Sequence, residues 1–399
     1  MIQFFRMNGY NKELLTKGVE EIHVKKHLEE QLSSGRKLRV KFGIDPTGPK
    51  IHLGRAIPLR KLRAFQDLGH QIVLIIGDFT AQIGDPSDKT SKRPFLTKEQ
   101  IKENLKDYLK QLGKIIDINK TEIRYNSEWL DKLTFREISQ LAEAFTVQQM
   151  LARRNFKERY EQGTEISLRE FMYPLMQGYD SVAVRADVEL GGFDQLFNLM
   201  AGREIQRQYG QEPQDILATM MLEGTDGRKM STSWGNVITI MDEPNDMFGR
   251  IMAVRDDLII KYFTLCANRS LEDIKKLEKQ LKQGVNPREI KFLLAVDIVT
   301  IYHSKQKAKQ AGEEFNKVFQ KKEKPTAIPV VMVKKGDRLL TDVLVEAKLA
   351  SSKSEAKRLI GQKGVKVDGK TWNDPFKKIS LGKIIIQVGK RKFAEVKGK

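Results

Sequence analysis

The amino-acid sequence predicts a doubly wound α/β domain with a parallel sheet, followed by an all-α domain and a small α+β domain. Two strand–turn–helix units indicate the first domain, a Rossmann-like domain over residues 1–240 with an inserted helical region. Unbroken helical periodicity indicates the second, over residues 241–320. Residues 321–335 have the lysine and proline content of a linker, and residues 336–399 form a distinct basic tail.

The first β–α–β unit is the basis for this fold class. Apolar residues at helical spacing predict a helix over residues 11–36, and the β-branched run 38–44 predicts a buried strand. A helix over 54–68 and a continuously apolar strand over 71–77 follow. Continuous apolar runs of this length are typical of strands covered on both faces of a parallel sheet.

Helices dominate the region that comes next. A helix is predicted over residues 98–112, and further helices are predicted within residues 115–185, including 141–154 and 167–179. A second unit then begins with a strand over 188–190, a turn at Gly191-Gly192 and a helix over 194–208. A further strand is predicted over 216–222.

The tail differs from the rest of the chain in its charge. It holds 16 Lys and Arg against seven Asp and Glu, a balance of +9 within the +19 of the whole chain. Ser352 and Glu355 form a capping-box pattern that opens a helix ending at Gly361. Asp368-Gly369, after a short strand, predicts a hairpin turn.

Composition limits the classes of protein that this chain can belong to. Its net charge of +19 favours a polyanionic partner, although a solvated basic surface would have the same composition. The single cysteine, Cys266, excludes disulfides and Cys-rich zinc sites, so we expect a reducing, cytoplasmic setting. No secretory signal is visible, and the longest apolar run, 72–76, is too short to cross a membrane. We therefore expect no membrane partner.

The turn after the first strand is the strongest candidate for a ligand site. Asp45-Pro46-Thr47-Gly48-Pro49 ends the strand, and His52-Leu53-Gly54 opens the next helix. This layout presents unpaired backbone N–H groups to an anion, at the edge of the sheet where α/β proteins bind ligands. Considered alone, His52 is more often a helix cap or a packing residue.

A second segment changes that interpretation. Lys229-Met230-Ser231-Thr232-Ser233 lies about 175 residues further along the chain, and alone it would be typical of a surface loop. Together the two segments resemble the paired signatures of class I aminoacyl-tRNA synthetases. Further motifs in family order resemble the tyrosyl-tRNA synthetases, in the bacterial branch that ends in a ribosomal-protein-type RNA-binding module. These motifs are Gly43–Thr47, Ile83–Ser87, Tyr173–Asp180 and Gly191–Gln195. Tryptophanyl enzymes share the fold but usually lack both the tail and the Gln177–Asp180 element.

The resemblance implies an ATP-dependent ligase that uses Mg²⁺, L-tyrosine and tRNA(Tyr) and is generally a homodimer. It activates tyrosine to tyrosyl-adenylate, releases pyrophosphate, and transfers tyrosine to the 3′ end of the tRNA. Donors and cations that stabilise charge on the phosphate would supply most of the catalysis. The catalytic residues so implied are Thr47, His52, Arg55, Lys89, Arg93, Lys229 and Thr232. The ATP-binding residues so implied are Gly43, Asp45, Thr47, His52, Gly54, Gly192, Asp194, Lys229, Met230 and Ser231. No dedicated metal cage is visible in the sequence.

A third set of residues is implied for recognition of the amino acid. Its members are Lys41, Asp85, Tyr173, Gln177, Asp180 and Gln195. Tyr173, Gln177 and Asp85 would surround the α-ammonium group, and Asp180 would accept the phenol hydroxyl. Phenylalanine leaves that acceptor unpaired, a means of rejection for which tyrosyl enzymes are the reference case. Lys41 stands where another branch of the family has a tyrosine that touches the phenol oxygen.

The resemblance assigns RNA binding to two basic clusters in the tail. The residues are Lys353, Lys357, Arg358 and Lys363 on or beside one helix, and Lys390, Arg391 and Lys392. Phosphate contacts of this kind give affinity and position rather than base identity.

Two positions depart from the family pattern. Arg55 replaces the second His of the first signature, and Thr232 replaces the second Lys of the other. Arg55 could restore the charge that Thr232 lacks. One alternative is a catalytically weakened paralogue that acts as an RNA-binding protein, and another keeps the reaction but changes the amino acid. The intact Asp85, Gln177 and Asp180 favour an active tyrosine ligase over a pure binder.

Overall fold

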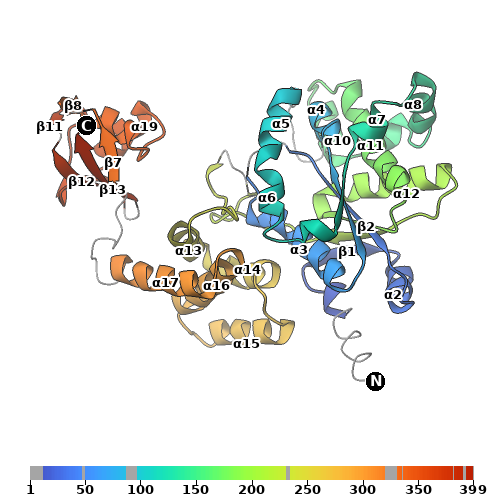
Figure 1. The fold of residues 1–399 in the computed structure, drawn as a ribbon, viewed down its shortest axis with the longest axis horizontal. Coiled ribbons are helices and arrows are strands. Elements are labelled where there is room, and N and C mark those ends of the chain that lie inside the picture. The colour runs from blue at the N-terminus through green and yellow to red at the C-terminus, as the bar shows by residue number, and fades with distance from the viewer. Residues whose placement is uncertain are drawn as a thin grey trace. The chain divides into compact units, whose positions relative to one another are not determined.

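The computed structural model of the protein describes residues 12–46, 50–86, 97–230, 234–319, 330–334, 336–380, 382–389 and 392–398. The chain forms two compact units. Met1–Glu243 and Arg250–Tyr302 make the first, and Pro244–Gly249 and His303–Lys399 make the second. Figure 1 labels their elements.

A six-stranded sheet organises the first unit, in the order β1-β6-β5-β2-β3-β4. Its strands are β1 Val19–His23, β2 Arg39–Ile44, β3 Gln71–Ile76, β4 Thr121–Tyr125, β5 Val188–Gly192 and β6 Asp215–Thr219. The edge strand β1 runs antiparallel to β6, and the other neighbours are parallel. The chain passes from β2 outward to β4 and then returns to β5 on the other side of β2. The predicted doubly wound fold is therefore confirmed, with its topological switch between β2 and β5.

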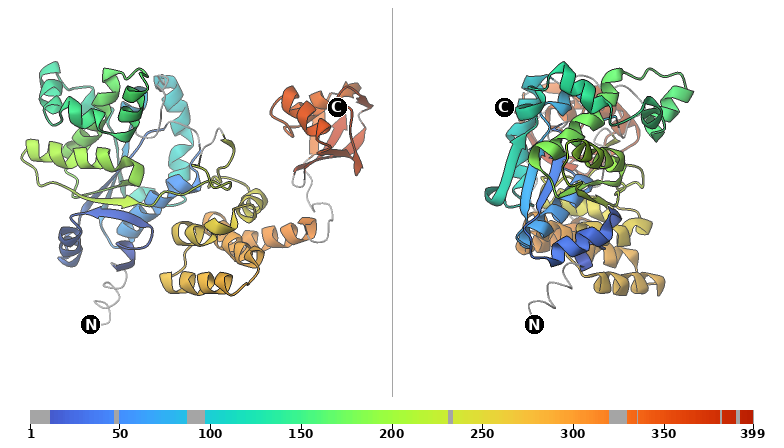
Figure 2. Two further views of the ribbon diagram at one scale, coloured as in Figure 1. Left: turned by 180° about the vertical axis from the view of Figure 1, so that it is seen from behind. Right: turned by 90° about the vertical axis from the view of Figure 1, so that its right-hand side faces the viewer.

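Helices cover both faces of this sheet, as Figure 2 shows. They are α2 Lys25–Ser33, α3 Leu53–Asp67, α4 Thr80–Ile83, α5 Lys98–Lys106, α6 Tyr108–Leu112, α7 Ser127–Leu130, α8 Phe135–Ala142, α9 Val147–Leu151, α10 Arg154–Glu161, α11 Leu168–Val184 and α12 Leu196–Gln208. Helix α3 buries Ala56, Leu59, Leu62 and Phe65, which lie on one helical face. Helices α11 and α12 approach closely through Gly178 and Gly202, where a Cβ atom would meet the partner helix or the side chains behind it.

Three local predictions were wrong. The helix expected over 11–36 is interrupted by β1, because Val19–His23 pairs with the free edge of β6. The helix expected over 98–112 breaks at Asp107 between α5 and α6. The region 115–185 contains the strand β4, and its expected helix 141–154 is replaced by parts of α8, α9 and α10. Strand pairing outweighed helical spacing at β1 and β4, and the Thr146 cap begins α9 within the expected helix 141–154.

The helical pattern predicted after residue 241 is confirmed. It corresponds to α13 Pro244–Met252, α14 Ile259–Cys266, α15 Leu271–Lys282, α16 Pro287–Tyr302 and α17 Lys305–Phe319. These helices are divided between the two units, so the domain boundaries drawn from the sequence remain a prediction. Within the described ranges, no helix combines the length and the apolarity that crossing a membrane requires.

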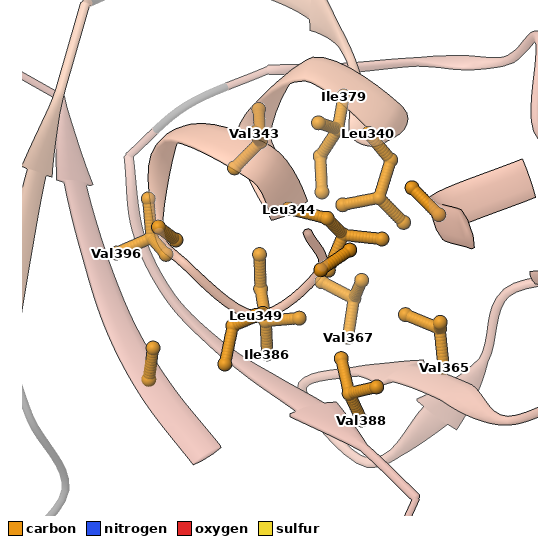
Figure 3. Packing of buried hydrophobic residues seen from close by; sticks show 14 of the residues in the cluster. Leu340, Val343, Leu344, Leu349, Val365, Val367, Ile379, Ile386, Val388 and Val396 are labelled. Carbon is orange, nitrogen blue, oxygen red and sulfur yellow. The ribbon is translucent and has the colours of Figure 1, made fainter. Parts of the chain in front are cut away.

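The last part of the second unit is a small α+β domain with its own core. Its elements are β7 Val330–Val333, β8 Asp337–Leu339, α18 Leu340–Glu346, α19 Lys353–Gly361, β9 Val365–Val367, β10 Lys370–Thr371, β11 Lys378–Ser380, β12 Lys383–Val388 and β13 Lys392–Gly398. Figure 3 shows Leu344 and Ile386 packed together with valines of α18, β9 and β12. The predicted helix cap and hairpin are present. Ser352 Oγ accepts a hydrogen bond from the Glu355 backbone at 3.1 Å, and Asp368 has a φ of 50°.

Candidate active site

A cavity of about 550 Å³ lies at the carboxyl ends of β2 and β5, at the topological switch. Fourteen of the residues predicted for the site line it: Gly43, Asp45, His52, Gly54, Arg55, Asp85, Tyr173, Gln177, Asp180, Gly192, Asp194, Gln195, Lys229 and Met230. Five others, Thr47, Lys89, Arg93, Ser231 and Thr232, lie outside the described residues. The structure thus gathers the two signature segments and the amino-acid motifs around one space.

The start of α3 is joined by backbone hydrogen bonds to residues 238–240, which follow the second signature segment. The Leu53 N–H donates to the Ile238 carbonyl at 2.9 Å, and the Ile240 N–H donates to the Ile51 carbonyl at 3.0 Å. Gly54 faces the other segment, where a Cβ atom would lie 3.2 Å from the His52 ring and 3.5 Å from Met230 Sδ. Lys229 and Met230 line the same cavity as His52 and Gly54 at the start of α3.

His52 is the N-cap of α3 and is held as a neutral donor. Burial, assisted by the charge of Arg55, lowers the pKa of His52 to about 3. Its Nδ1 accepts a hydrogen bond from the Arg55 backbone N–H at 3.4 Å, so its proton belongs on Nε2. Arg55 itself donates from Nη1 to the Tyr108 hydroxyl at 3.3 Å. One neutral donor and one permanent cation therefore share the first turn of the helix.

Asp45 is fixed from two sides. Its Oδ1 accepts from the Thr80 hydroxyl at 2.7 Å, and its Oδ2 accepts from the Tyr173 hydroxyl at 2.8 Å. Because the Tyr173 hydroxyl donates its proton to Asp45, its oxygen can interact with a cationic ligand only as an acceptor. Asp85 Oδ2 accepts a hydrogen bond from Gln195 Nε2 at 2.7 Å. Two carboxylates and a hydroxyl oxygen therefore line the cavity as acceptors suited to an ammonium group.

Asp180 is a buried carboxyl group on the cavity wall. Trp129 Nε1 donates to its Oδ1 at 2.8 Å, and Asn126 Nδ2 approaches its Oδ2 at 3.4 Å. Burial raises the pKa of Asp180 to about 7, although the positive charge of Lys41 opposes that shift. Each carboxyl oxygen has one protein donor and still has a lone pair for a ligand hydroxyl.

Lys41, which was predicted to help recognise the amino acid, does not lie on the cavity wall. Among the described residues that line the cavity Lys41 does not occur, and its side chain is 0% exposed. Its ammonium lies 3.0 Å from Glu189 Oε1, behind Gln177 and Asp180. A role of Lys41 in binding tyrosine remains a prediction.

Sequence reasoning missed four residues that shape the site. Thr80 and Asn126 line the cavity, whereas Trp129 and Glu189 hold residues that do. Asn126 follows directly on β4 at a strand end, which is the usual place for a site residue in such sheets. The alternation of polar and apolar residues over Thr121–Tyr125 is the strand signal that could have found it, but this short segment was assigned to a helical region.

The predicted RNA-binding residues lie on the small domain. The Lys353 ammonium is 2.8 Å from Asp342, and Lys357 lies over the ring of Phe376 at 5.0 Å. Arg358 donates to Gln362 at 3.0 Å. Lys363 follows α19 with a φ of 57°. Lys390 and Arg391 lie outside the described residues, and Lys392 is described only as the first residue of β13.

Comparison with known proteins decides the family. The model for class I tRNA synthetases of the tryptophan and tyrosine type matches residues 33–320, and an S4 domain model matches residues 338–385. The chain belongs to the class I tRNA synthetases. The first match spans both signature segments, and the second falls within the small C-terminal domain.

Curated relatives agree along nearly the whole chain. A tyrosine–tRNA ligase of Thermotoga maritima is 49% identical over 388 residues, covering 96% of both chains. One of Burkholderia thailandensis is 48% identical and covers 95% of this chain and 93% of its own. Among solved structures, the synthetase fold matches a mitochondrial tyrosyl-tRNA synthetase of Aspergillus nidulans. That match has a TM-score of 0.64 and 20% identity, and it covers 79% of this chain and 99% of the other.

Proposed function

We propose that this synthetase is a tyrosine–tRNA ligase, which joins L-tyrosine to the 3′ end of tRNA(Tyr) using ATP. The observation that supports tyrosine most directly is Asp180, a buried carboxyl group on the cavity wall whose oxygens are held by Trp129 and Asn126. Such an acceptor suits a phenol hydroxyl, and phenylalanine would leave it unpaired. The names of the curated relatives favour the same substrate.

The first step joins the amino acid to ATP. A carboxylate oxygen of tyrosine attacks the α-phosphorus, the bond to the bridging oxygen breaks, and pyrophosphate leaves. No catalytic base is needed, because the attacking group is already an anion. His52 as a neutral donor, Arg55 and Lys229 as cations, and the N-terminus of α3 stabilise the charge that gathers on the phosphate.

The second step uses the tRNA. The hydroxyl of its 3′-terminal ribose attacks the acyl carbon of tyrosyl-adenylate, AMP leaves, and the hydroxyl proton is lost. Asp85, Gln177 and Tyr173 hold the ammonium of tyrosine through both steps, so that the acyl carbon stays in one place. Asp45, Gly192, Asp194 and Gln195 contact the nucleotide and the adenylate.

ATP reacts as its complex with Mg²⁺, and phosphate oxygens and water supply most of the metal ligands. Thr47, Lys89, Arg93, Ser231 and Thr232 contact the triphosphate. The helices after residue 241 contact the anticodon stem, the basic residues of the small domain bind tRNA phosphates, and the enzyme acts as a cytoplasmic homodimer.

The test is ATP–pyrophosphate exchange measured with tyrosine, phenylalanine and tryptophan in turn. We expect exchange with tyrosine at a kcat/KM at least about 10³-fold above that for phenylalanine, because a polar site rejects a ligand that lacks the matching hydroxyl. Exchange with another amino acid in place of tyrosine would reassign the substrate. Tight tRNA binding without any exchange would overturn the ligase proposal.

A further inference from the structure

A buried ion pair lies directly behind the amino-acid side of the cavity. Lys41 on β2 and Glu189 on β5 are register partners on adjacent parallel strands, at the topological switch of the sheet. Lys41 Nζ lies 3.0 Å from Glu189 Oε1, and the two side chains are 0% and 1% exposed. Neither residue lines the cavity among the described residues, and the reaction as proposed above uses neither.

The pair is surrounded by polar groups that use its remaining hydrogen-bonding capacity. Lys41 Nζ also donates to Ser181 Oγ at 2.7 Å and to the Gln177 backbone carbonyl at 2.9 Å. Glu189 Oε2 accepts from Ser181 Oγ at 3.2 Å and from the Gln214 side-chain amide. The network therefore joins both strands of the switch to helix α11, which carries Gln177 and Asp180.

One hydrogen bond of this network reaches the cavity wall. Gln177 Nε2 donates to Glu189 Oε1 at 3.2 Å, and Gln177 lines the cavity. The nitrogen and oxygen of a side-chain amide point in different directions, so a nitrogen held by Glu189 leaves Oε1 for the cavity. The flipped amide would set its oxygen against a carboxylate, which repels it. Glu189 therefore selects the orientation in which Gln177 offers an acceptor.

The orientation of the Gln177 amide affects binding because the proposed substrate carries an ammonium group. An ammonium group has three N–H donors and no acceptor, so it gains from an amide oxygen and loses from an amide nitrogen. We infer that Glu189, held by Lys41, is a positioning residue that fixes the Gln177 amide for the α-ammonium group of the amino acid. This inference rests on the proposed function, because it takes the cavity ligand to be an amino acid.

Stability alone does not explain the pair. A buried ion pair is often no more stabilising than apolar residues of similar volume, because desolvation offsets the attraction between the charges. A second buried pair in the same unit, Arg159 with Glu170, lies off the cavity lining and provides a matched control. The Lys41–Glu189 pair differs from it by reaching a residue on the cavity wall.

The test replaces both charges, so that no buried charge is left without a partner. Lys41→Met/Glu189→Met is compared with the parent full-length chain and with Arg159→Met/Glu170→Met. Calorimetric titration without ATP measures the Kd of three ligands. Tyrosine carries the ammonium and the carboxylate, tyramine carries only the ammonium, and 3-(4-hydroxyphenyl)propionate carries only the carboxylate.

We expect Lys41→Met/Glu189→Met to weaken tyrosine and tyramine about tenfold and to change the propionate less than about twofold. The control pair should leave all three unchanged. Ratios between ligands on one variant do not depend on the folded fraction, so partial misfolding cannot imitate this result. Equal weakening of all three ligands, or no change in any, would overturn the inference. Failure of the parent chain to bind tyrosine would instead overturn the proposed function.

Discussion

The hydroxyl of Tyr173 donates a hydrogen bond to Asp45 Oδ2 at 2.8 Å, which links helix α11 to the end of strand β2. This bond uses the hydroxyl proton, so the Tyr173 oxygen can meet a ligand only as an acceptor. It also gives Asp45 a second donor beside Thr80. One contact thus orients both a residue proposed to bind the ammonium group and a residue proposed to contact the nucleotide.

Tyr173→Phe should therefore raise the KM for tyrosine about tenfold in pyrophosphate exchange, because a hydrogen bond to a charged group is lost. The KM for ATP should rise less, since Thr80 still holds Asp45. Tyr179→Phe is the matched control, because Tyr179 packs against Tyr209 and does not line the cavity. Equal effects of the two substitutions would contradict the assigned role of Tyr173.

Asp180 should make tyrosine binding depend on pH. Burial raises its pKa from 3.8 to about 7, with Lys41 and the donors Trp129 and Asn126 opposing the shift and Glu189 adding to it. The ionised carboxylate is the better acceptor for a phenol hydroxyl. Between about pH 8 and pH 6 the Kd for tyrosine should rise roughly tenfold in titration calorimetry. A flat profile between these values would contradict this role, and Asp180→Asn should abolish the dependence.

The same pKa shift affects folding stability with a definite sign. The folded chain retains a proton on Asp180 between pH 3.8 and about 7, whereas the unfolded chain loses it. The stabilising contribution is present at low pH and is lost as pH rises through about 7. Urea unfolding of the parent chain and of Asp180→Asn should show the variant gaining relative stability as pH rises toward 8.

His52 should act as a neutral donor throughout the working range, since burial lowers its pKa to about 3. Loss of one such donor to a charge-developing transition state typically costs about 3 kcal/mol. We therefore expect His52→Ala to lower the kcat of exchange about 100-fold with little change in the KM for tyrosine. The profile between pH 5 and 8 should keep its shape in the variant. If an ionisation between pH 5 and 8 were present in the profile of the parent chain and absent from that of His52→Ala, His52 would titrate in that range.

Arg55 and Thr232 are expected to compensate each other across the triphosphate. Arg55→His removes a permanent cation, and Thr232→Lys supplies one, so the double variant should recover most of the exchange activity lost in Arg55→His. The measurement is kcat/KM for ATP in exchange, for each single variant and for both together. Simple additivity of the two effects would rule out the compensation.

The small domain should bind tRNA through charge and through one exposed ring. Phe376 is 68% exposed and lies beneath the Lys357 ammonium. Lys357→Gln should lower the slope of log affinity against log salt by about one, as expected for a lost phosphate contact. Phe376→Leu should weaken binding while leaving that slope unchanged, because base stacking carries no net charge. Lys26→Gln on α2 is the control. If this substitution also lowered the slope of log affinity against log salt, the effect of Lys357→Gln would reflect net charge rather than a phosphate contact at Lys357.

Strands were predicted correctly from the sequence where the local residue pattern agreed with the tertiary environment. Strands β2, β3 and β5 are largely buried, and they fall close to where they were predicted. Strand β4 was missed because it is a short edge strand of five residues between helices, and with it Asn126 was missed. Strand β1 was missed because only pairing with β6 distinguishes it from a helix.

The same contrast holds for the site. Motifs placed Asp85, Tyr173 and Asp180 on one cavity, since their residue types carry the chemistry. They did not show that Lys41 points away from that cavity toward Glu189. The orientation of a side chain on a buried strand depends on its partners on neighbouring strands, and a single sequence does not display those partners.

The close packing of α11 against α12 restricts how this enzyme can evolve a new substrate preference. A Cβ atom at Gly178 would lie 2.6 Å from Ile205 Cδ1, and one at Gly202 would lie 2.8 Å from Ser181 Oγ and overlap the Gln214 amide. A side chain at either glycine would therefore meet close neighbours, and one at Gly202 would also press on Gln214, Ser181 and Glu189 of the Lys41–Glu189 network. Laboratory evolution that starts from random mutations should therefore rarely recover variants at either glycine.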